Sequence, residues 1–164
     1  MEAATLHPPP SRIETEIRRV RELLRRREFE AALRAGKALL AEVPENRDAL
    51  YVVAVSQRYL QRIPDALTTL ARLETLHPRY PRLFQERGHC HVALRDAGPA
   101  IAAFEQALML NSALPASWRS LSVLYRLAGR EADAKKAAEN VERLKSLPVD
   151  GVNKKAVGRS KRTA

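Results

Sequence analysis

The sequence has 164 residues, 45% of them hydrophobic and 29% charged, which is enough for one folded domain. No stretch approaches the roughly 18 apolar residues that a membrane span needs, which argues against an integral membrane protein. The first residues lack the apolar segment of a signal peptide, and a single cysteine, Cys90, rules out an internal disulfide. We therefore expect a protein of a reducing compartment, the cytoplasm.

Residues 1–11 contain three consecutive prolines, which forbid a helix and predict a disordered, proline-rich leader. The rest of the chain lacks the alternation of apolar and polar residues that strands would show, so we predict an all-α fold. Four prolines lie near predicted helix starts, where a missing N–H costs nothing: Pro64, Pro81, Pro99 and Pro115. In chain order the eight predicted helices are 12–26, 29–42, 47–60, 64–76, 81–95, 99–110, 115–128 and 131–147.

A period of 34 residues runs through these helices. It separates four alanines in the second helix of each pair, namely Ala32, Ala66, Ala100 and Ala134. The same period separates mostly small residues of the first helices, namely Val20, Ala54, Gly88 and Ser122. Small side chains at these positions allow two helices to approach closely, and aromatic side chains fill the space between them. The aromatic residues expected in this packing role are Phe29, Phe84, Phe104, Trp118 and Tyr125.

This period and these residue types match the tetratricopeptide repeat. The third repeat shows the pattern best, with Phe84-x-x-Arg87-Gly88-x-x-His91 in its first helix and Ala100-x-x-x-Phe104 in its second. Over about residues 13–148 the chain resembles the tetratricopeptide family. The resemblance implies an all-α, right-handed superhelical solenoid of four helix-turn-helix repeats. We place this domain at residues 12–148, with repeats at about 13–46, 47–80, 81–114 and 115–148.

The first and last repeats carry charge where the inner repeats are apolar. Arg19 stands where the second repeat has Val53, and Lys135 stands where the third repeat has Ile101. Charge at these positions predicts that the outer faces of both end repeats meet water, as capping repeats do.

The net charge of +10 is concentrated in part near the end of the sequence. Residues 149–164 form a predicted flexible tail with five cations, namely Lys154, Lys155, Arg159, Lys161 and Arg162. Such a tail can bind nucleic acid or an acidic membrane surface by releasing counterions, which gives one functional hypothesis. The alternative is a solvated end, since no aromatic residue lies among these cations to stack on bases.

The sequence contains no catalytic or cofactor motif. A phosphate-binding loop, a dinucleotide-binding glycine pattern, a zinc-protease motif and a nucleophile elbow are all missing. His89-Cys90-His91 combines zinc-ligating residue types, but three consecutive helical residues point about 100° apart and cannot close on one ion. We therefore predict no enzyme activity, no metal and no cofactor.

Repeats of this family form a concave groove lined by the first helix of each pair, and the resemblance implies that a peptide or partner protein binds there. The predicted groove residues in this sequence are Tyr51, Val55, Arg58, Tyr59, Arg82, Gln85, His89, Arg119 and Arg126. The same projection also includes Arg21, Leu24, Asp48, Val92 and Val123. Arginine forks and tyrosine faces suit a partner with acidic groups. A non-catalytic protein–protein interaction scaffold is therefore the favoured hypothesis.

Chaperone-binding members of the family hold a C-terminal carboxylate with lysines, asparagines and an arginine on three consecutive first helices. At the corresponding positions this sequence has Ile17 and Arg21, then Val52, then Arg82 and Glu86. The carboxylate clamp is therefore absent.

A narrower resemblance covers His89 to Pro148, most clearly Leu110 to Arg119. It is similar to the N-terminal repeat region of bacterial tetratricopeptide sulfotransferases. The resemblance implies an adaptor arm of such an enzyme, and this sequence contains no sulfotransferase domain.

Overall fold

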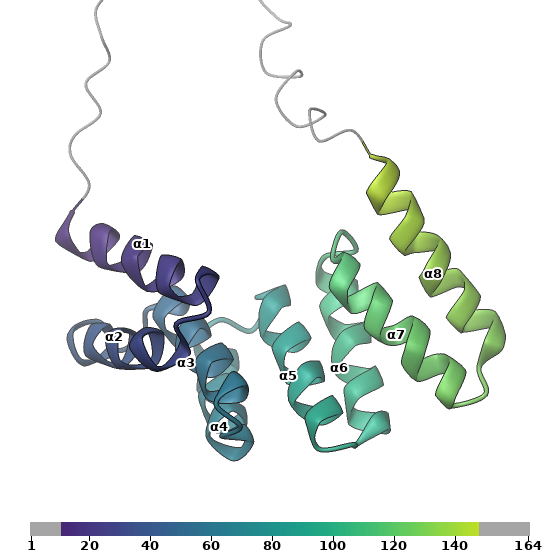
Figure 1. Cartoon of the computed structure of the whole chain (residues 1–164), viewed down its shortest axis with the longest axis horizontal. Coiled ribbons are helices and arrows are strands. Elements are labelled where there is room, and N and C mark those ends of the chain that lie inside the picture. Colours follow the sequence, from purple (N-terminus) through teal and green to yellow (C-terminus); the bar gives the residue numbers. More distant parts are fainter. Residues whose placement is uncertain (1–10, 148–164) are drawn as a thin grey trace, which may run out of the picture.

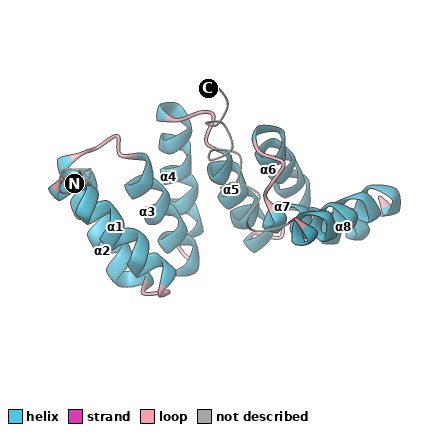
Figure 2. Ribbon diagram, turned by 90° about the horizontal axis from the view of Figure 1, so that it is seen from above, coloured by secondary structure: helices cyan, strands magenta, loops and turns pink. Residues whose placement is uncertain are grey.

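The computed structural model describes residues 11–147, and these form the predicted all-α solenoid of four helix pairs (Figure 1). Each helix packs against the next in the chain, and the pairs follow an arc with α4, α5 and α6 at its bottom. Short loops connect the helices (Figure 2). The helices are α1 Arg12–Arg25, α2 Phe29–Glu42, α3 Arg47–Tyr59, α4 Ile63–Leu76, α5 Pro81–Ala93, α6 Ala97–Leu110, α7 Pro115–Leu127 and α8 Glu131–Ser146.

Helix ends agree with the sequence prediction to within one or two residues. The largest difference lies in the third repeat, where α5 ends at Ala93 and α6 already begins at Ala97. The prediction started α6 at Pro99, but proline is tolerated throughout the first turn, whose N–H groups have no helical partner. At the other end of the described chain, Ser11 caps α1, and its hydroxyl accepts a hydrogen bond from the Glu14 N–H at 3.2 Å.

The turn within each repeat has one residue with a left-handed backbone, and these four residues are again 34 apart. They are Arg27 (φ 62°), Gln61 (φ 62°), Arg95 (φ 58°) and Gly129 (φ 72°). In the first turn the Arg27 N–H donates to Leu24 O, and the next N–H, of Glu28, reaches back to Leu23 O, both at 3.0 Å. This pattern closes all four helix ends and satisfies their carbonyl groups, although only one of the four residues is a glycine.

The core consists of three clusters, one at each joint between successive repeats. The N-terminal joint contains Val20, Ala32, Leu39, Ala49 and Val52. The middle joint is larger and includes Leu50, Leu70, Leu83, Phe84 and Ala107. The C-terminal joint includes Phe104, Leu121, Tyr125, Ala134 and Ala137. Each repeat therefore buries its apolar face against its neighbours, as expected of a solenoid.

The small residues of the 34-residue columns lie where helices approach closely. All four column alanines are buried. At Gly88 an added Cβ would lie 2.7 Å from the Cζ atom of Phe104, so α6 packs directly on the α5 backbone. Gly36, which the columns do not include, has the same role on α2, where a Cβ would lie 2.8 Å from Val53 Cγ2.

One of the five aromatic residues expected to fill the core, Phe29, lies apart from it. Phe29 is only half-buried, because its ring stacks on Tyr59 at the molecular surface, with 4.2 Å between ring centroids. Trp118 is also half-buried, but it packs against the C-terminal joint, and its indole N–H donates to Ser112 O at 2.8 Å.

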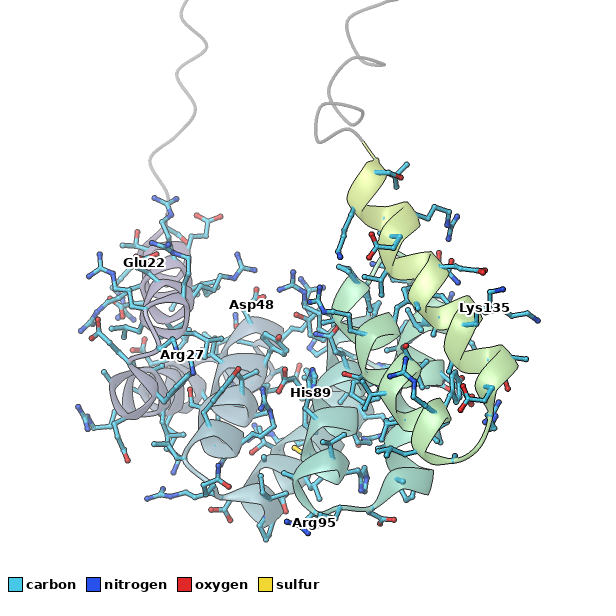
Figure 3. The ribbon with its side chains drawn as sticks, turned by 45° about the vertical axis from the view of Figure 1, so that its right-hand side comes forward. Glu22, Arg27, Asp48, His89, Arg95 and Lys135 are labelled. Atoms are coloured by element: carbon cyan, nitrogen blue, oxygen red, sulfur yellow. The ribbon has the colours of Figure 1, made fainter. Side chains whose placement is uncertain are left out.

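The charged residues of the end repeats meet water. Arg19 on α1 and Lys135 on α8 are exposed, and Figure 3 shows Lys135 pointing away from α8. Of the helices described between residues 11 and 147, none is long and apolar enough to cross a membrane. Residues 1–10 of the predicted leader and the predicted tail at 149–164 lie outside the described residues.

Candidate functional site

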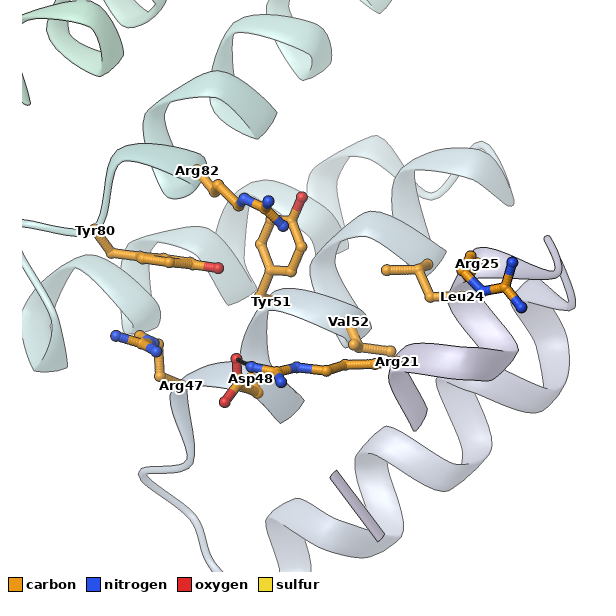
Figure 4. A pocket seen from close by; sticks show the side chains of 9 residues that line it. All are labelled: Arg21, Leu24, Arg25, Arg47, Asp48, Tyr51, Val52, Tyr80 and Arg82. Atoms are coloured by element: carbon orange, nitrogen blue, oxygen red, sulfur yellow. Dashed lines mark hydrogen bonds and ion pairs between the residues drawn. The ribbon is translucent and has the colours of Figure 1, made fainter. Parts of the chain in front are cut away.

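The first helices of the four pairs, α1, α3, α5 and α7, carry the residues predicted to form the concave face. A cavity of about 620 Å³ opens between α1, α3 and the beginning of α5 (Figure 4). We call it the cup. Its lining residues are Arg21, Leu24, Arg25, Arg47, Asp48, Tyr51, Val52, Tyr80 and Arg82.

The cup is rich in cations, and two of them have carboxylate partners. Arg21 Nη2 lies 2.7 Å from Asp48 Oδ1, which ties α1 to α3. Arg25 Nη2 lies 2.7 Å from Glu22 Oε1 within α1. No carboxylate among residues 11–147 lies within ion-pair distance of Arg47 or Arg82. The cup therefore carries a net positive charge.

Two tyrosines form one wall of the cup. The rings of Tyr51 and Tyr80 meet edge to face at 5.7 Å and 86°, and the Arg47 guanidinium lies 4.9 Å from the centroid of the Tyr80 ring. Figure 4 shows Tyr80 reaching across the cup, with Arg47 on one side of its ring and Arg82 on the other. Burial raises the pKa of both tyrosines, so their hydroxyl groups stay protonated and can donate hydrogen bonds.

A second cavity, of about 320 Å³, adjoins the cup and shares Leu24, Arg25 and Tyr51 with it. Its wall is the Phe29–Tyr59 stack, whose rings are nearly parallel at 6°. The Arg27 guanidinium lies about 5.5 Å from the Phe29 centroid and 5.3 Å from the Tyr59 centroid. Aromatic faces with adjacent cations thus continue from the cup along the concave face.

Arg58 and Glu86 form a buried ion pair at the centre of the concave face. Arg58 Nε on α3 lies 2.8 Å from Glu86 Oε2 on α5, and the side chains are only 17% and 6% exposed. Burial disfavours the charge on Arg58, but the adjacent Glu86 more than offsets this and raises the pKa of Arg58. The sequence projection placed Arg58 in the groove as a free cation, whereas the protein supplies its own carboxylate for it. The sequence carries one indication of this pair. Glu86 is the charged residue at a repeat position where the second and fourth repeats have the uncharged Val52 and Ser120.

The far half of the concave face carries exposed apolar side chains as well as cations. Val92 on α5 and Val123 and Leu127 on α7 are 44%, 54% and 78% exposed, and we call these three residues the apolar patch. Two predicted groove residues, Arg119 and Arg126, are also exposed on α7. Leu127 was not in the projection, although it follows Arg126 directly and is one of the most exposed large apolar side chains.

Three other predicted groove residues are engaged in internal packing. Val55 is only 5% exposed, although it lines the second cavity. Gln85 accepts a hydrogen bond from the buried Ser117 hydroxyl at 3.0 Å, which ties α5 to α7. The His89 ring packs edge-on against Phe104 at 5.0 Å, and burial lowers its pKa.

The His89-Cys90-His91 triplet is spread over three environments. Cys90 lies in the middle joint, where burial raises the pKa of its thiol to about 11. His91 Nδ1 lies 3.9 Å from Asp96 Oδ2, on a different side of α5 from His89. In the part of the chain that the structure describes, no three His, Cys, Asp or Glu side chains converge where a metal ion could bind.

Comparisons with known proteins identify similar structures. Neither a protein-family model nor a curated protein matches the sequence. Among solved structures, TTC0263, a thermophilic TPR protein in Thermus thermophilus, has a TM-score of 0.73 and 26% identity, over 83% of this chain and 75% of that one. Two MamA structures have TM-scores of 0.70 and 0.66 at 16% and 20% identity, over 84% and 81% of this chain and 80% and 73% of theirs. By fold, the chain is therefore a tetratricopeptide solenoid of four repeats.

Proposed function

We propose that this chain is a non-catalytic scaffold whose concave face binds a segment of a partner protein. The cup carries this proposal, because it is a cavity on that face with a net positive charge and two tyrosine rings in its lining. Arginine and tyrosine are among the residues enriched at the energetic centres of protein–protein interfaces.

The two halves of the concave face suit different parts of one partner. The cup and the adjoining Phe29–Tyr59 stack offer cations and aromatic rings, which favour acidic groups. The apolar patch at the far half favours apolar side chains, whose burial removes hydrocarbon surface from water. The proposed ligand is therefore a segment that carries acidic groups together with apolar residues.

Charge reversal on the concave face tests this function. Replacing Arg82 and Arg119 with Glu should weaken binding of a partner recovered on the immobilised full chain by at least about tenfold and should flatten its salt dependence. A matched control reverses Arg34 and Lys136, which are exposed on α2 and α8 and line none of the cavities described above. The affinity of each double variant for the partner is measured by titration at several salt concentrations. If the two variants bind the partner equally well, the concave face is not the binding site of the partner.

A second candidate function is nucleic-acid or acidic-surface binding through the five cations of residues 149–164. Deleting these residues separates the two functions. A scaffold keeps its affinity for the partner, whereas a tail-driven binder loses its retention on nucleic acid at low salt. The narrower hypothesis, that the chain is the adaptor arm of a tetratricopeptide sulfotransferase, rests on the sequence resemblance and predicts that the chain itself binds no sulfate donor.

A further inference from the structure

The charges of the cup are not balanced by one carboxylate. Four arginines line it, namely Arg21, Arg25, Arg47 and Arg82. Asp48 pairs with Arg21, and Glu22 pairs with Arg25 and also with Arg26, which lies outside the cup. Arg47 and Arg82 therefore remain without a carboxylate partner in the described residues. A ligand with one carboxylate would leave one guanidinium uncompensated. A phosphate monoester carries a charge of about −1.5 to −2 at pH 7 and matches both.

Hydrogen-bond donors surround the open space of the cup. Arg82 has no hydrogen-bond partner in the described residues, and a guanidinium presents a planar fork that fits phosphate oxygens. The Tyr51 and Tyr80 hydroxyls stay protonated and add two neutral donors. The Arg47 cation against the Tyr80 ring supplies further positive charge behind this wall. Three oxygens of a phosphate group can use this set of donors, whereas a carboxylate has only two oxygens.

The surroundings of the cup favour a phosphate group that is attached to a chain. A cavity of about 620 Å³ has room for more than the phosphate alone. It also continues past Leu24 and Tyr51 into the second cavity, where residues that flank the phosphate would meet the Phe29–Tyr59 stack.

Building on the scaffold function proposed above, we propose that the cup recognises a phosphorylated side chain of the partner protein. Arg82 and Arg47 compensate the charge of the phosphate, and Tyr51 and Tyr80 donate hydrogen bonds to its oxygens. Asp48 is adjacent, but its charge is neutralised by Arg21.

Peptide probes on the full chain test this proposal. Three blocked pentapeptides, Ala-Ala-X-Ala-Ala with phosphoserine, glutamate or serine at X, are titrated and followed by 15N NMR, with inorganic phosphate as a fourth probe. We expect shifts at residues 47–51 and 80–82 and an affinity for phosphoserine at least about tenfold above that for glutamate. The serine peptide should cause no shifts at these residues, and inorganic phosphate should bind more weakly than the phosphoserine peptide.

The pH dependence gives an independent readout. The charged groups that line the cup are four guanidinium groups and one carboxylate, and its lining includes no histidine. The second pKa of a phosphate monoester is about 6. Affinity for the phosphoserine peptide should therefore rise with pH across this range, while affinity for the glutamate peptide stays constant.

Variants locate the site. Arg82→Gln should weaken phosphoserine binding by about tenfold, and Tyr80→Phe by a smaller factor, because one removes a charge-assisted and the other a neutral hydrogen bond. Arg34→Gln, an equal change on the exposed side of α2, should leave it unchanged. Preserved chemical shifts elsewhere in each variant confirm that it is folded.

The outcomes separate this inference from the scaffold function. Equal affinity for the phosphoserine and glutamate peptides would overturn phosphate recognition and leave the scaffold proposal intact. Phosphate recognition would also be overturned if Arg82→Gln did not change the affinity for the phosphoserine peptide, or if inorganic phosphate bound as tightly as that peptide. Two results together would instead refute the scaffold function: the chain selects phosphoserine, and the affinity of the partner protein does not change when Arg82 and Arg119 are replaced with Glu.

Discussion

The close contact between Gly88 on α5 and Phe104 on α6 allows a sharp test of the repeat packing. Replacing Gly88 with Ala adds one methyl group, whose carbon would lie 2.7–2.8 Å from Cζ, Cε1 and Cε2 of the fully buried Phe104 ring. Real Cβ atoms do not approach other carbons so closely, so the ring or the helix must move. Gly98 on α6 is the comparison position, because apart from its chain neighbours a Cβ there meets nothing within 4 Å.

The expected free energies follow from two opposing effects. Alanine is favoured over glycine in a helix interior by up to about 1 kcal/mol. This gain applies at Gly88 and is smaller at Gly98, which lies in the first turn of α6 and precedes Pro99. Overpacking at Gly88 should cost about 1–3 kcal/mol, and this cost applies to that position alone. Gly98→Ala should therefore raise the free energy of unfolding slightly. Gly88→Ala should leave it about 1–3 kcal/mol below that of the Gly98→Ala variant.

Urea unfolding of a double-mutant cycle with Phe104→Leu completes the test. Leucine lacks the three ring atoms that the new methyl group would meet, so Gly88→Ala should lose its penalty in the Phe104→Leu background. We expect a coupling energy of about 1–3 kcal/mol between the two positions. If Gly88→Ala stabilises the wild-type protein as much as Gly98→Ala does, α5 and α6 do not pack on each other at this point.

Three further predictions concern the ion pair, the turns and the response to pH. Glu86→Ala leaves the Arg58 charge buried without a partner and should lower the free energy of unfolding by about 3–5 kcal/mol. Replacing both Glu86 and Arg58 with apolar residues should restore most of the lost stability. Urea titration measures both effects. Gln61→Gly or Arg95→Gly should raise thermal stability modestly, because each residue has a left-handed backbone that costs about 1–2 kcal/mol without glycine. Burial raises the pKa of Tyr51, so its contribution to stability is complete below the unfolded-state pKa of about 10 and is lost as pH rises above it. Tyr51→Phe should show a smaller loss of stability between pH 9 and about 11.

Each of these predictions has a clear contrary result. A Glu86→Ala variant as stable as wild type would mean that water compensates Arg58 in its place. Destabilisation by glycine at both turn positions would show that these side chains contribute more than their backbone strain costs. An identical alkaline loss of stability in the Tyr51→Phe variant would assign the effect to the other buried tyrosines.

The helices and their pairing could be predicted because backbone approach requires particular residue types. Only small side chains fit where two helices touch, so Ala66 and Gly88 mark such places directly. The left-handed turns were not predictable in this way, because Gln61 and Arg95 have no side-chain feature that favours a positive φ. The length of the loop and its hydrogen bonds impose that conformation, and they depend on the two helices that it joins.

The candidate site was predictable only in part. The resemblance to the tetratricopeptide family placed Tyr51 and Arg82 in the predicted groove, and both line the cup. Tyr80 and Arg47 were missed because they lie at the beginnings of α5 and α3, outside the repeat positions that the family projects into the groove. The ion pair between Arg58 and Glu86 was missed for a different reason. Ion pairs between repeats depend on which long side chains meet across a joint. A repeat pattern predicts where a residue lies on its helix, but it does not predict which side chain of the next repeat it contacts.

The N-terminal joint has a consequence for how binding and folding are connected. Its cluster has five buried residues and no aromatic ring, whereas the other two clusters are larger and contain Phe84 and Phe104. In a solenoid each repeat is held only by its neighbours, so the first repeat should be the unit that opens at the lowest free energy. The cup spans this joint, with Arg21 on α1 and its other walls on α3 and α5. Any ligand that bridges them adds its binding free energy to the docking of α1, and hydrogen exchange in α1 and α2 should slow in proportion to ligand concentration.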